Sequence, residues 1–564
     1  MSPDKQDHSY ESQEVRHIQS EDLGKPENLE DITTGPSPPS EWIQGWRLAA
    51  IALGTCIAVG MTQADSTIAS TAILVITDDL GGFDTSPWVF TGYLITYGGM
   101  GSFPIILARV SDIVGRKAVF LTCLLMFTIF SGACGASQTL LEMIMFRWVQ
   151  GLGASGVLSI GTLYGFELRP PGKWPAYSAL ISLAVSISLS IALVIGAALT
   201  QIGQWRWIFL INAPIGATGF LLLMLGMPSK LPREPASHAA NVKRWYHNLQ
   251  KLDFPGVFAL VGASVLLTAA LEQAAAGRSF AAHTIIPLLV LAPIFLLVFL
   301  FWQWFSTTRP GQSIADPILS WNLLSDRVFL GVLINAFFSG AIITVSIVQI
   351  PQRFIIVNGL SPIDAGVRLI PFTAVMAFTA VIMSIVLSKS NIPVLYWLLF
   401  GGLLQVAGIA GFSQLSVNHD IEPSQYGFQI LAGAGVGMFN VVLLLLTPYV
   451  VENQHLGMKG TFNDATEADR RIAVANGAIN QFRLLGGSFG LSIVVCASNS
   501  SLRHHLLSIL EPSQVSVLLS RTETILALPD ATQIIVRKMF GQSYNLQMLI
   551  VIGFAAANIP VSLM

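Results

Sequence analysis

Apolar runs of about 20 residues recur along the chain from residue 48 to its last residue, 564. Each run is long enough to cross the hydrocarbon core of a bilayer as an α-helix. Hydrophobic residues make up 53% of the chain and charged residues only 11%, whereas a soluble domain carries about 25% charged residues. The pattern therefore predicts an all-α polytopic membrane protein.

The runs are separated by polar or Pro- and Gly-containing breaks and predict about fourteen transmembrane helices in a 6+2+6 arrangement. The first six lie at 48–74, 86–108, 117–136, 140–166, 176–201 and 207–226. An inserted pair follows at 254–274 and 283–305, and the last six lie at 328–350, 362–388, 392–413, 426–449, 473–498 and 545–564.

These spans suggest a domain organisation. We expect a disordered, acidic, Ser- and Pro-rich tail, two six-helix bundles, and a pair of helices inserted between them after a basic loop. The expected segments are a tail at 1–46, an N-terminal bundle at 47–228, a cytoplasmic loop at 229–253, the inserted helices at 254–305, and a C-terminal bundle at 306–564 with a long outer loop at 499–544.

The distribution of basic residues predicts the orientation in the membrane. Lys and Arg concentrate in the short loops on the side of the N-terminus, for example Arg116 and Lys117, while few, such as Arg206, lie opposite. By the positive-inside rule both termini are cytoplasmic. The tail has no apolar h-region, so the first span would act as an uncleaved signal. We expect the plasma membrane, with the vacuolar membrane as the alternative.

Several functional classes are disfavoured by the composition. The formal net charge is −2, and no basic surface cluster suggests a nucleic acid partner. All four cysteines lie inside apolar runs without metal-type spacing, which favours packing. No set of His, Asp and Glu at membrane depth has the spacing of a metal or nucleophile site. We therefore expect no enzyme, metal or cofactor.

Charged residues inside the spans are the first functional candidates, because each costs at least ~2.5–3.5 kcal/mol at the bilayer centre. They are Asp65, Arg147, Arg368 and Arg483. Burial and a nearby cation shift a carboxyl pKa in opposite directions, so an embedded Asp can gain and lose a proton near neutral pH. Asp65 is thus a candidate for proton coupling.

The arginines Arg147 and Arg483 stay protonated, so they are interpreted as fixed charges that anchor substrate, carboxylates or helix ends. Amide side chains also recur at membrane depth. Two roles are open for them, because an amide is satisfied equally by interhelical hydrogen bonds and by a polar cavity. The amides are Asn335, Gln349, Asn440, Asn480 and Gln481.

The loop Ala108-Arg-Val-Ser-Asp112-Ile-Val-Gly115-Arg116-Lys117 resembles the cytoplasmic motif between helices 2 and 3 of the major facilitator superfamily. Gly115 permits a tight turn, and Asp112 can pair with basic residues or with a helix N-terminus. Arg116 and Lys117 hold the cytoplasmic face. The resemblance implies that these four residues form a cytoplasmic gate.

The segment Arg147-Trp-Val-Gln150-Gly151 resembles the helix 4 motif of the same superfamily. Three further segments resemble its fourteen-span drug:proton antiporter subfamily, in particular the fungal multidrug and toxin exporters. They are Asp65-Ser-Thr67-Ile68 with Trp88 and Tyr93, Trp205-Arg206-Trp207 through Asn212-Ala-Pro214-Ile-Gly216, and Asn358-Gly359-Leu-Ser361-Pro362 through Pro371. The arginine of the helix 4 motif is associated in that family with proton coupling. The resemblance thus implies a major facilitator fold.

The chain departs from the subfamily pattern in three places. Ala192-Leu193 stands where the exporter motif has Gly-Pro, and Arg353 replaces an aromatic residue, which would suit an anionic or polyoxygenated substrate. The chain also stops at Met564, close to the end of its last span and without a cytoplasmic tail, so an incomplete C-terminus is one alternative.

We therefore expect a monomeric secondary transporter that uses a proton gradient to export small amphipathic compounds by alternating access. Asp65 and Arg147 would couple the proton. The predicted substrate cavity combines the five amides at membrane depth with Arg483. A proton-coupled importer of siderophores or basic amino acids, and a non-transporting membrane sensor, are the alternatives.

Overall fold

The computed structural model describes residues 44–80, 87–94, 96–97, 110–111, 114–167, 174–228, 253–275, 280–309, 321–390, 392–417, 420–457, 465–520, 525 and 528–564. These residues belong to one compact unit, Trp42–Met564. The expected tail at 1–46 lies almost wholly outside them, and so do most of the basic loop at 229–253 and Asp112 of the expected gate. The described residues are helical or in short connections, with no strand among them, which confirms the all-α prediction.

Thirteen helices of the described part are long and apolar enough to cross a membrane. The expected span at 86–108 is described only in part, by α2 (Pro87–Leu94) and by residues 96 and 97. The other helices of the first block are α1 (Trp46–Leu80), α4 (Arg116–Ala136), α5 (Leu140–Glu167), α6 (Trp174–Gln201), α7 (Arg206–Leu210) and α8 (Asn212–Gly226). The protein is therefore a multi-pass membrane protein.

The second part of the chain contains an inserted pair and a further set of helices. The pair is α10 (Phe254–Ala275) and α11 (Ile286–Thr308), followed by the short α12 (Trp321–Leu324). The remaining helices are α13 (Arg327–Ile356), α14 (Pro362–Val367), α15 (Ile370–Lys389), α16 (Val394–Ser413), α17 (Ser424–Gly457), α18 (Ala465–Leu506), α19 (Pro512–Ser520) and α20 (Asp530–Ser562).

Local sequence explains where helices begin. The carboxylate of Asp326 accepts a hydrogen bond of 3.0 Å from the N–H of Phe329 and caps α13. Ser361 caps α14 in the same way, and Pro362 occupies the first helical position, where a missing N–H costs nothing. Gly359, two residues earlier, has a φ of 67°, which glycine adopts without a steric penalty.

The segment 499–544 differs from the expected outer loop. α18 continues to Leu506, α19 occupies part of the middle, and α20 already begins at Asp530. Polar residues lower the hydropathy of this segment, but its helices bury an apolar cluster of their own that includes Leu506, Val515 and Phe540. Amphipathic packing thus extends two membrane helices beyond their apolar runs.

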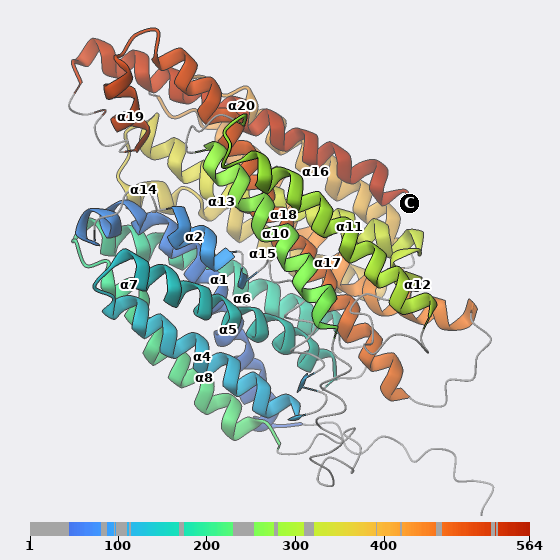
Figure 1. Cartoon of the computed structure of the whole chain (residues 1–564). Coiled ribbons are helices and arrows are strands. Elements are labelled where there is room, and N and C mark those ends of the chain that lie inside the picture. Colours follow the sequence, from blue (N-terminus) through green and yellow to red (C-terminus); the bar gives the residue numbers. More distant parts are fainter. Residues whose placement is uncertain are drawn as a thin grey trace, which may run out of the picture. The chain divides into compact units, whose positions relative to one another are not determined.

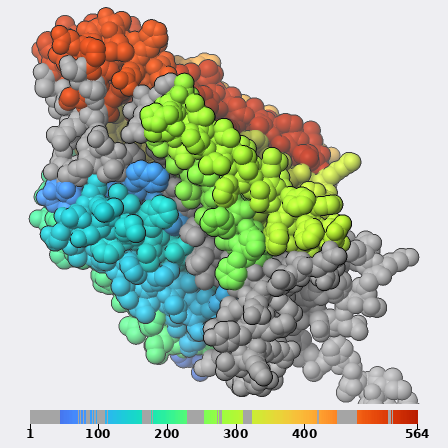
Figure 2. All heavy atoms as spheres, viewed as in Figure 1, coloured from blue at the N-terminus to red at the C-terminus, as the bar shows by residue number. Residues whose placement is uncertain are grey.

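Each half of the chain has its own core. In the first half, α1 packs on α6 and α8, and α4 packs on α5. In the second half, α13 packs on α18, and α17 packs on α15 and α16. The inserted α10 and α11 form a hairpin that contacts α18 through α10 (Figure 1). The atoms of this hairpin lie on the face shown in Figure 2, and α11 exposes apolar side chains such as Leu297 and Phe301, as expected for a helix in lipid.

The two halves meet mainly through α6, which contacts α14, α15 and α17. Leu189 and Leu193 of α6 belong to the same apolar cluster as Phe372 and Met376 of α15. The hydroxyls of Ser190 and Thr373 lie 2.5 Å apart across this boundary. The first half therefore contacts the second half mainly through a single helix, α6.

Candidate functional site

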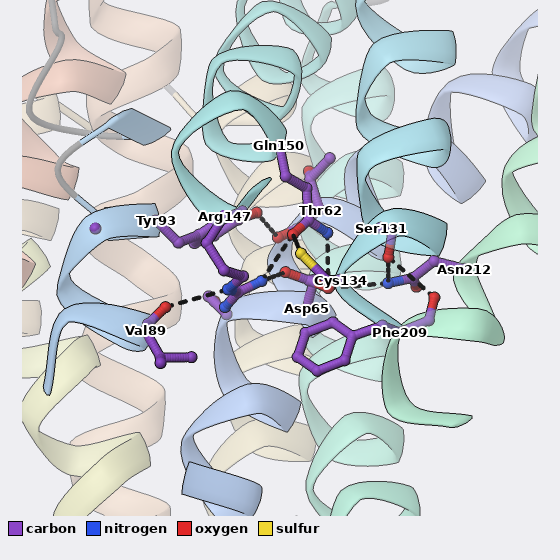
Figure 3. Close-up of polar contacts among 12 residues, drawn as sticks. Thr62, Asp65, Val89, Tyr93, Ser131, Cys134, Arg147, Gln150, Phe209 and Asn212 are labelled. Carbon is purple, nitrogen blue, oxygen red and sulfur yellow. Dashed lines mark hydrogen bonds and ion pairs between the residues drawn. The ribbon is translucent and has the colours of Figure 1, made fainter. Parts of the chain in front are cut away.

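A buried ion pair lies in the first half of the chain, between α1 and α5 (Figure 3). The guanidinium NH1 of Arg147 donates to Oδ2 of Asp65, and both side chains have an exposed fraction of 0%. Two charges without access to water require close pairing and further hydrogen bonds. The structure thus brings together the two residues that the sequence predicts for proton coupling.

Two amides complete the surroundings of the carboxylate (Figure 3). Oδ1 of Asp65 accepts hydrogen bonds from Nε2 of Gln150 at 3.1 Å and from Nδ2 of Asn212 at 2.9 Å. Gln150 in turn accepts from NH1 of Arg147 at 3.0 Å, and Asn212 also donates to Oγ of Ser131 at 2.9 Å. Two helices, α5 and α8, therefore converge on one carboxylate of α1, and α4 holds Asn212 in place through Ser131.

The guanidinium of Arg147 is held on its other sides by α2 and by aromatic rings. Its Nε donates to the carbonyl oxygen of Val89 at 3.2 Å, and its Cζ lies 4.3 Å from the ring centroid of Tyr93 and 5.4 Å from that of Phe209. Such cation–π contacts stabilise a cation away from water. Its NH2 has no hydrogen-bond partner among the described residues, so the pair is tightly packed but not fully satisfied.

Glycines next to Arg147 permit this geometry. A Cβ added to Gly151 would lie 1.9 Å from Oγ1 of Thr96, and one added to Gly153 would lie 2.7 Å from the backbone nitrogen of Phe127. Side chains at either position would force α5 away from α2 or α4. The Arg147-Trp-Val-Gln150-Gly151 segment therefore supplies the charge, an amide partner and the close approach of the helices.

A second polar group lies in the other half of the chain, on α17 and α18. NH2 of Arg483 donates to Oδ1 of Asn480 at 3.0 Å, and NH1 lies 3.5 Å from Oδ1 of Asn440. A Cβ on Gly486 would lie 1.8 Å from the carbonyl oxygen of Phe337, so α18 approaches the backbone of α13 at this depth. Residues at i and i+3 share a helix face, which explains why Asn480 and Arg483 act together.

A cavity lies between the two halves, and this polar group forms part of its wall. Its volume is about 40 Å³. Its lining residues come from α5, α6, α15, α17 and α18, and they are Leu158, Thr162, Ile181, Ser182, Val185, Ser186, Met376, Ala380, Asn440, Leu444, Asn480 and Arg483. Both halves therefore contribute to one site, which is lined by apolar and polar side chains in equal number.

The other amides predicted for the cavity are not among its lining residues. Asn335 accepts a hydrogen bond of 3.3 Å from Ser562 of α20, and Gln349 is buried on α13. Gln481 is buried as well, and its amide atoms have no partner among the described residues. One residue along a helix rotates a side chain by about 100°, so Gln481 points away from the face that Asn480 and Arg483 share.

The described residues of the expected gate form a turn and hold the ends of two helices together. Gly115 has a φ of 108°, and Arg116 donates to Oγ of Ser111 at 2.5 Å. Nζ of Lys117 donates to the carbonyl oxygens of Met224 and Met227 at 2.7 and 2.6 Å. A cation at the last carbonyls of a helix compensates the helix dipole, so Lys117 ties α4 to the end of α8.

The predicted position Arg353 and the predicted segment that begins at Trp205 also hold helices together. Arg353 donates to Oδ1 of Asn545 at 2.7 Å and to the carbonyl oxygen of Ser416 at 2.8 Å, and it does not line the cavity. At the far end of α1, the carboxylate of Asp79 accepts from Nε1 of Trp205 at 3.0 Å and from Arg206 at 2.9 Å. These two donors lower the pKa of Asp79.

Gln150 and Asn212 are site residues that the sequence does not predict, although both stand in segments that resemble family motifs. The signal available was an amide at membrane depth, since Asn212 lies in an apolar run and Gln150 follows Arg147 by three residues. No group of three or more His, Cys, Asp or Glu among the described side chains could hold a metal ion.

Comparisons with known proteins identify relatives of the whole arrangement. A sequence profile described as Major Facilitator Superfamily matches residues 55–491. The chain is 33% identical over 521 residues to an MFS-type transporter of Fusarium mangiferae, and the aligned region covers 91% of this chain and 83% of the relative. It is 27% identical over 478 residues to a rubrofusarin-specific efflux pump of Gibberella zeae, which covers 83% of this chain and 80% of the relative.

A solved structure shares the fold at low sequence identity. It is a bacterial homolog of the human lysosomal transporter Spinster in an inward-facing, occupied conformation, with a TM-score of 0.56 and 12% identity over 92% of this chain and 97% of the other. This likeness, together with the profile match, confirms the predicted fold.

Proposed function

The chain belongs to the major facilitator superfamily and is a secondary transporter, and we propose that it exports small amphipathic compounds in exchange for protons. The observation that carries this proposal is the buried Asp65–Arg147 pair. A carboxylate at membrane depth is costly, and a group of this kind is a functional candidate by default.

In the proposed cycle, Asp65 is the residue that gains and loses the proton. A proton bound at Oδ2, the oxygen that faces Arg147, neutralises the carboxylate and leaves the guanidinium without its counter-charge. Breaking a buried pair in this way costs about 3–5 kcal/mol. That cost favours a rearrangement of α1 against α5 and α8 that gives Arg147 new partners. When Asp65 loses its proton again, the ion pair is restored.

The movement that such a rearrangement would drive is a rocking of the two halves about the cavity. Ser182, Ser186 and Ser190 lie four residues apart on one face of α6, where the first two line the cavity and the third contacts Thr373. Leu193, about one turn beyond Ser190 on α6, packs against Gly366 of α14. In the proposed orientation, α6 runs from the cytoplasmic side to the outer side of the membrane. The contacts of Ser190 and Leu193 then close the outer side of the cavity, and the cavity opens to the cytoplasmic side.

The direction of transport and the setting complete the proposal. The relative from Gibberella zeae is an efflux pump by name, which supports export in preference to uptake. The basic residues support cytoplasmic termini by the positive-inside rule. We propose the plasma membrane as the site of action, the vacuolar membrane being the alternative, and a monomer as the working unit, because one chain supplies both halves of the cavity.

The test is transport into proteoliposomes that contain purified protein, with and without an imposed pH gradient. The probes are labelled lipophilic cations, polyketide-like acids and amino acids. We expect accumulation of an amphipathic probe against its gradient only when the pH gradient is present, and loss of this dependence in Asp65→Asn.

Asp530→Asn is the matched control, because Asp530 is an exposed carboxylate in the first turn of α20. It should transport like the wild type. Gradient-driven accumulation at the wild-type rate by Asp65→Asn would contradict the assignment of the proton. Accumulation of amino acids only, in the import direction, would contradict export of amphipathic compounds.

A further inference from the structure

The charge balance of the cavity differs from that of the buried pair. Arg147 faces the carboxylate of Asp65, whereas no carboxylate among the described residues lies within ion-pair distance of Arg483. The partners of Arg483 are the neutral amide oxygens of Asn440 and Asn480. The cavity therefore carries a net positive charge at its polar wall.

One of the amides that hold Arg483 has a donor without a partner. Asn480 directs its Oδ1 at the guanidinium, and its Nδ2, in a side chain with an exposed fraction of only 4%, has no partner in the described structure. A buried polar donor without a partner is unfavourable. The polar group of the wall thus has an unsatisfied N–H beside a cation and lacks a matching anion.

The remaining walls define the rest of the ligand. Leu158, Ile181 and Val185 from the first half face Met376 and Leu444 from the second half. Apolar walls of this kind bind the body of a ligand, while the few polar groups fix its orientation. The hydroxyl of Ser186 donates to the carbonyl oxygen of Ser182 at 2.8 Å, so its oxygen remains free to accept a hydrogen bond from a ligand.

We propose that the cavity selects anionic amphipathic compounds: an apolar body that carries one carboxylate or acidic phenolate, bound by Arg483 and by Nδ2 of Asn480. This inference rests on the proposed transport role of the cavity. A charge-assisted hydrogen bond to a guanidinium is about twice as strong as a neutral one, so the anion supplies the interaction that Asn440 and Asn480 cannot. A cationic ligand would meet the like charge of Arg483.

The experiment compares three compounds that share an apolar body. They are 2-naphthoxyacetic acid, its primary amide, and 2-naphthoxyethylamine, which are anionic, neutral and cationic near pH 7. Binding to purified wild-type protein in detergent is measured by isothermal titration calorimetry, without a pH gradient. We expect the acid to bind about tenfold or more tightly than the amide, and the amine to bind more weakly than the amide.

Variants then assign the preference to Arg483. Arg483→Gln should bind acid and amide equally, while Arg483→Lys, which keeps the charge, should retain a preference for the acid. Arg368→Gln is the matched control, because this guanidinium donates to Oη of Tyr426 and does not line the cavity. It should keep the full preference.

Equal affinity for acid and amide in the wild type, tighter binding of the amine, or no binding of the acid would overturn the inference without any variant. A preference for the acid that survives in Arg483→Gln would do the same. The result of this binding experiment can be distinguished from the result of the proton-coupling test. Selective binding of the acid by a protein indifferent to pH gradients would keep this inference and overturn proton exchange, while gradient-driven transport of the amine alone would do the reverse.

Discussion

Removing the charges of the buried pair one at a time and together should reveal how strongly Asp65 and Arg147 depend on each other. In Asp65→Asn the guanidinium loses its counter-charge and, among the described residues, keeps hydrogen bonds only to Gln150 and Val89. In Arg147→Gln the carboxylate keeps only the amides of Gln150 and Asn212. Each variant should lose about 3–5 kcal/mol of unfolding free energy, because an uncompensated charge stays buried.

The double variant removes both charges and leaves neutral amides of similar size. Its loss should be smaller than the sum of the two single losses, with a coupling free energy of at least about 2 kcal/mol. The assay is equilibrium unfolding of the four proteins in mixed micelles of a mild detergent and dodecyl sulfate. Losses that add to within about 0.5 kcal/mol would refute the conclusion that the two residues form one electrostatic unit.

Three further changes test other parts of the structure. Gly486→Ala places a Cβ 1.8 Å from a backbone oxygen of α13, so its yield of folded protein in size-exclusion chromatography should fall sharply, whereas Gly553→Ala, with nothing within 4 Å, should behave like the wild type. Lys117→Met removes the cation from the end of α8 and should cost about 0.3–1 kcal/mol in the same unfolding assay. The lowered pKa of Asp79 means that its bonds to Trp205 and Arg206 stabilise the protein at neutral pH and are lost as pH falls below the usual Asp range through the lowered value. Because the side chains of Asp79 and Arg206 are well exposed, the difference between wild type and Asp79→Asn should stay below about 1 kcal/mol and vanish in acid; a difference that grows in acid would contradict the sign.

The features that could be predicted from the sequence are those fixed by one segment at a time. Membrane cost alone singles out Asp65 and Arg147, since each stands in an apolar run. The helix ends depend on more. Residues 499–544 are polar enough to resemble a loop, yet Leu506 and Phe540 pack together from different helices. Hydropathy detects burial in lipid and does not detect an amphipathic core outside it.

The composition of the cavity depends on which faces of separate helices meet, and no single segment contains that information. Asn480 and Arg483 line it because their spacing puts them on one face, whereas Gln481 is buried elsewhere. Asn335 lies at a similar depth but bonds to Ser562 of the last helix. An amide in a span thus indicates hydrogen bonding, and only the packing of the helices decides between structure and cavity.

The most direct test of the central proposal, that Asp65 carries the exchanged proton, is proton movement driven by substrate alone. Proteoliposomes are loaded with a transported compound and a pH-sensitive dye, placed in compound-free medium at equal pH, and followed by fluorescence. We expect the wild-type interior to acidify as compound leaves and protons enter, while Asp65→Asn shows no acidification. Equal acidification in both proteins, or export from the wild type without any change of internal pH, would contradict this proposal.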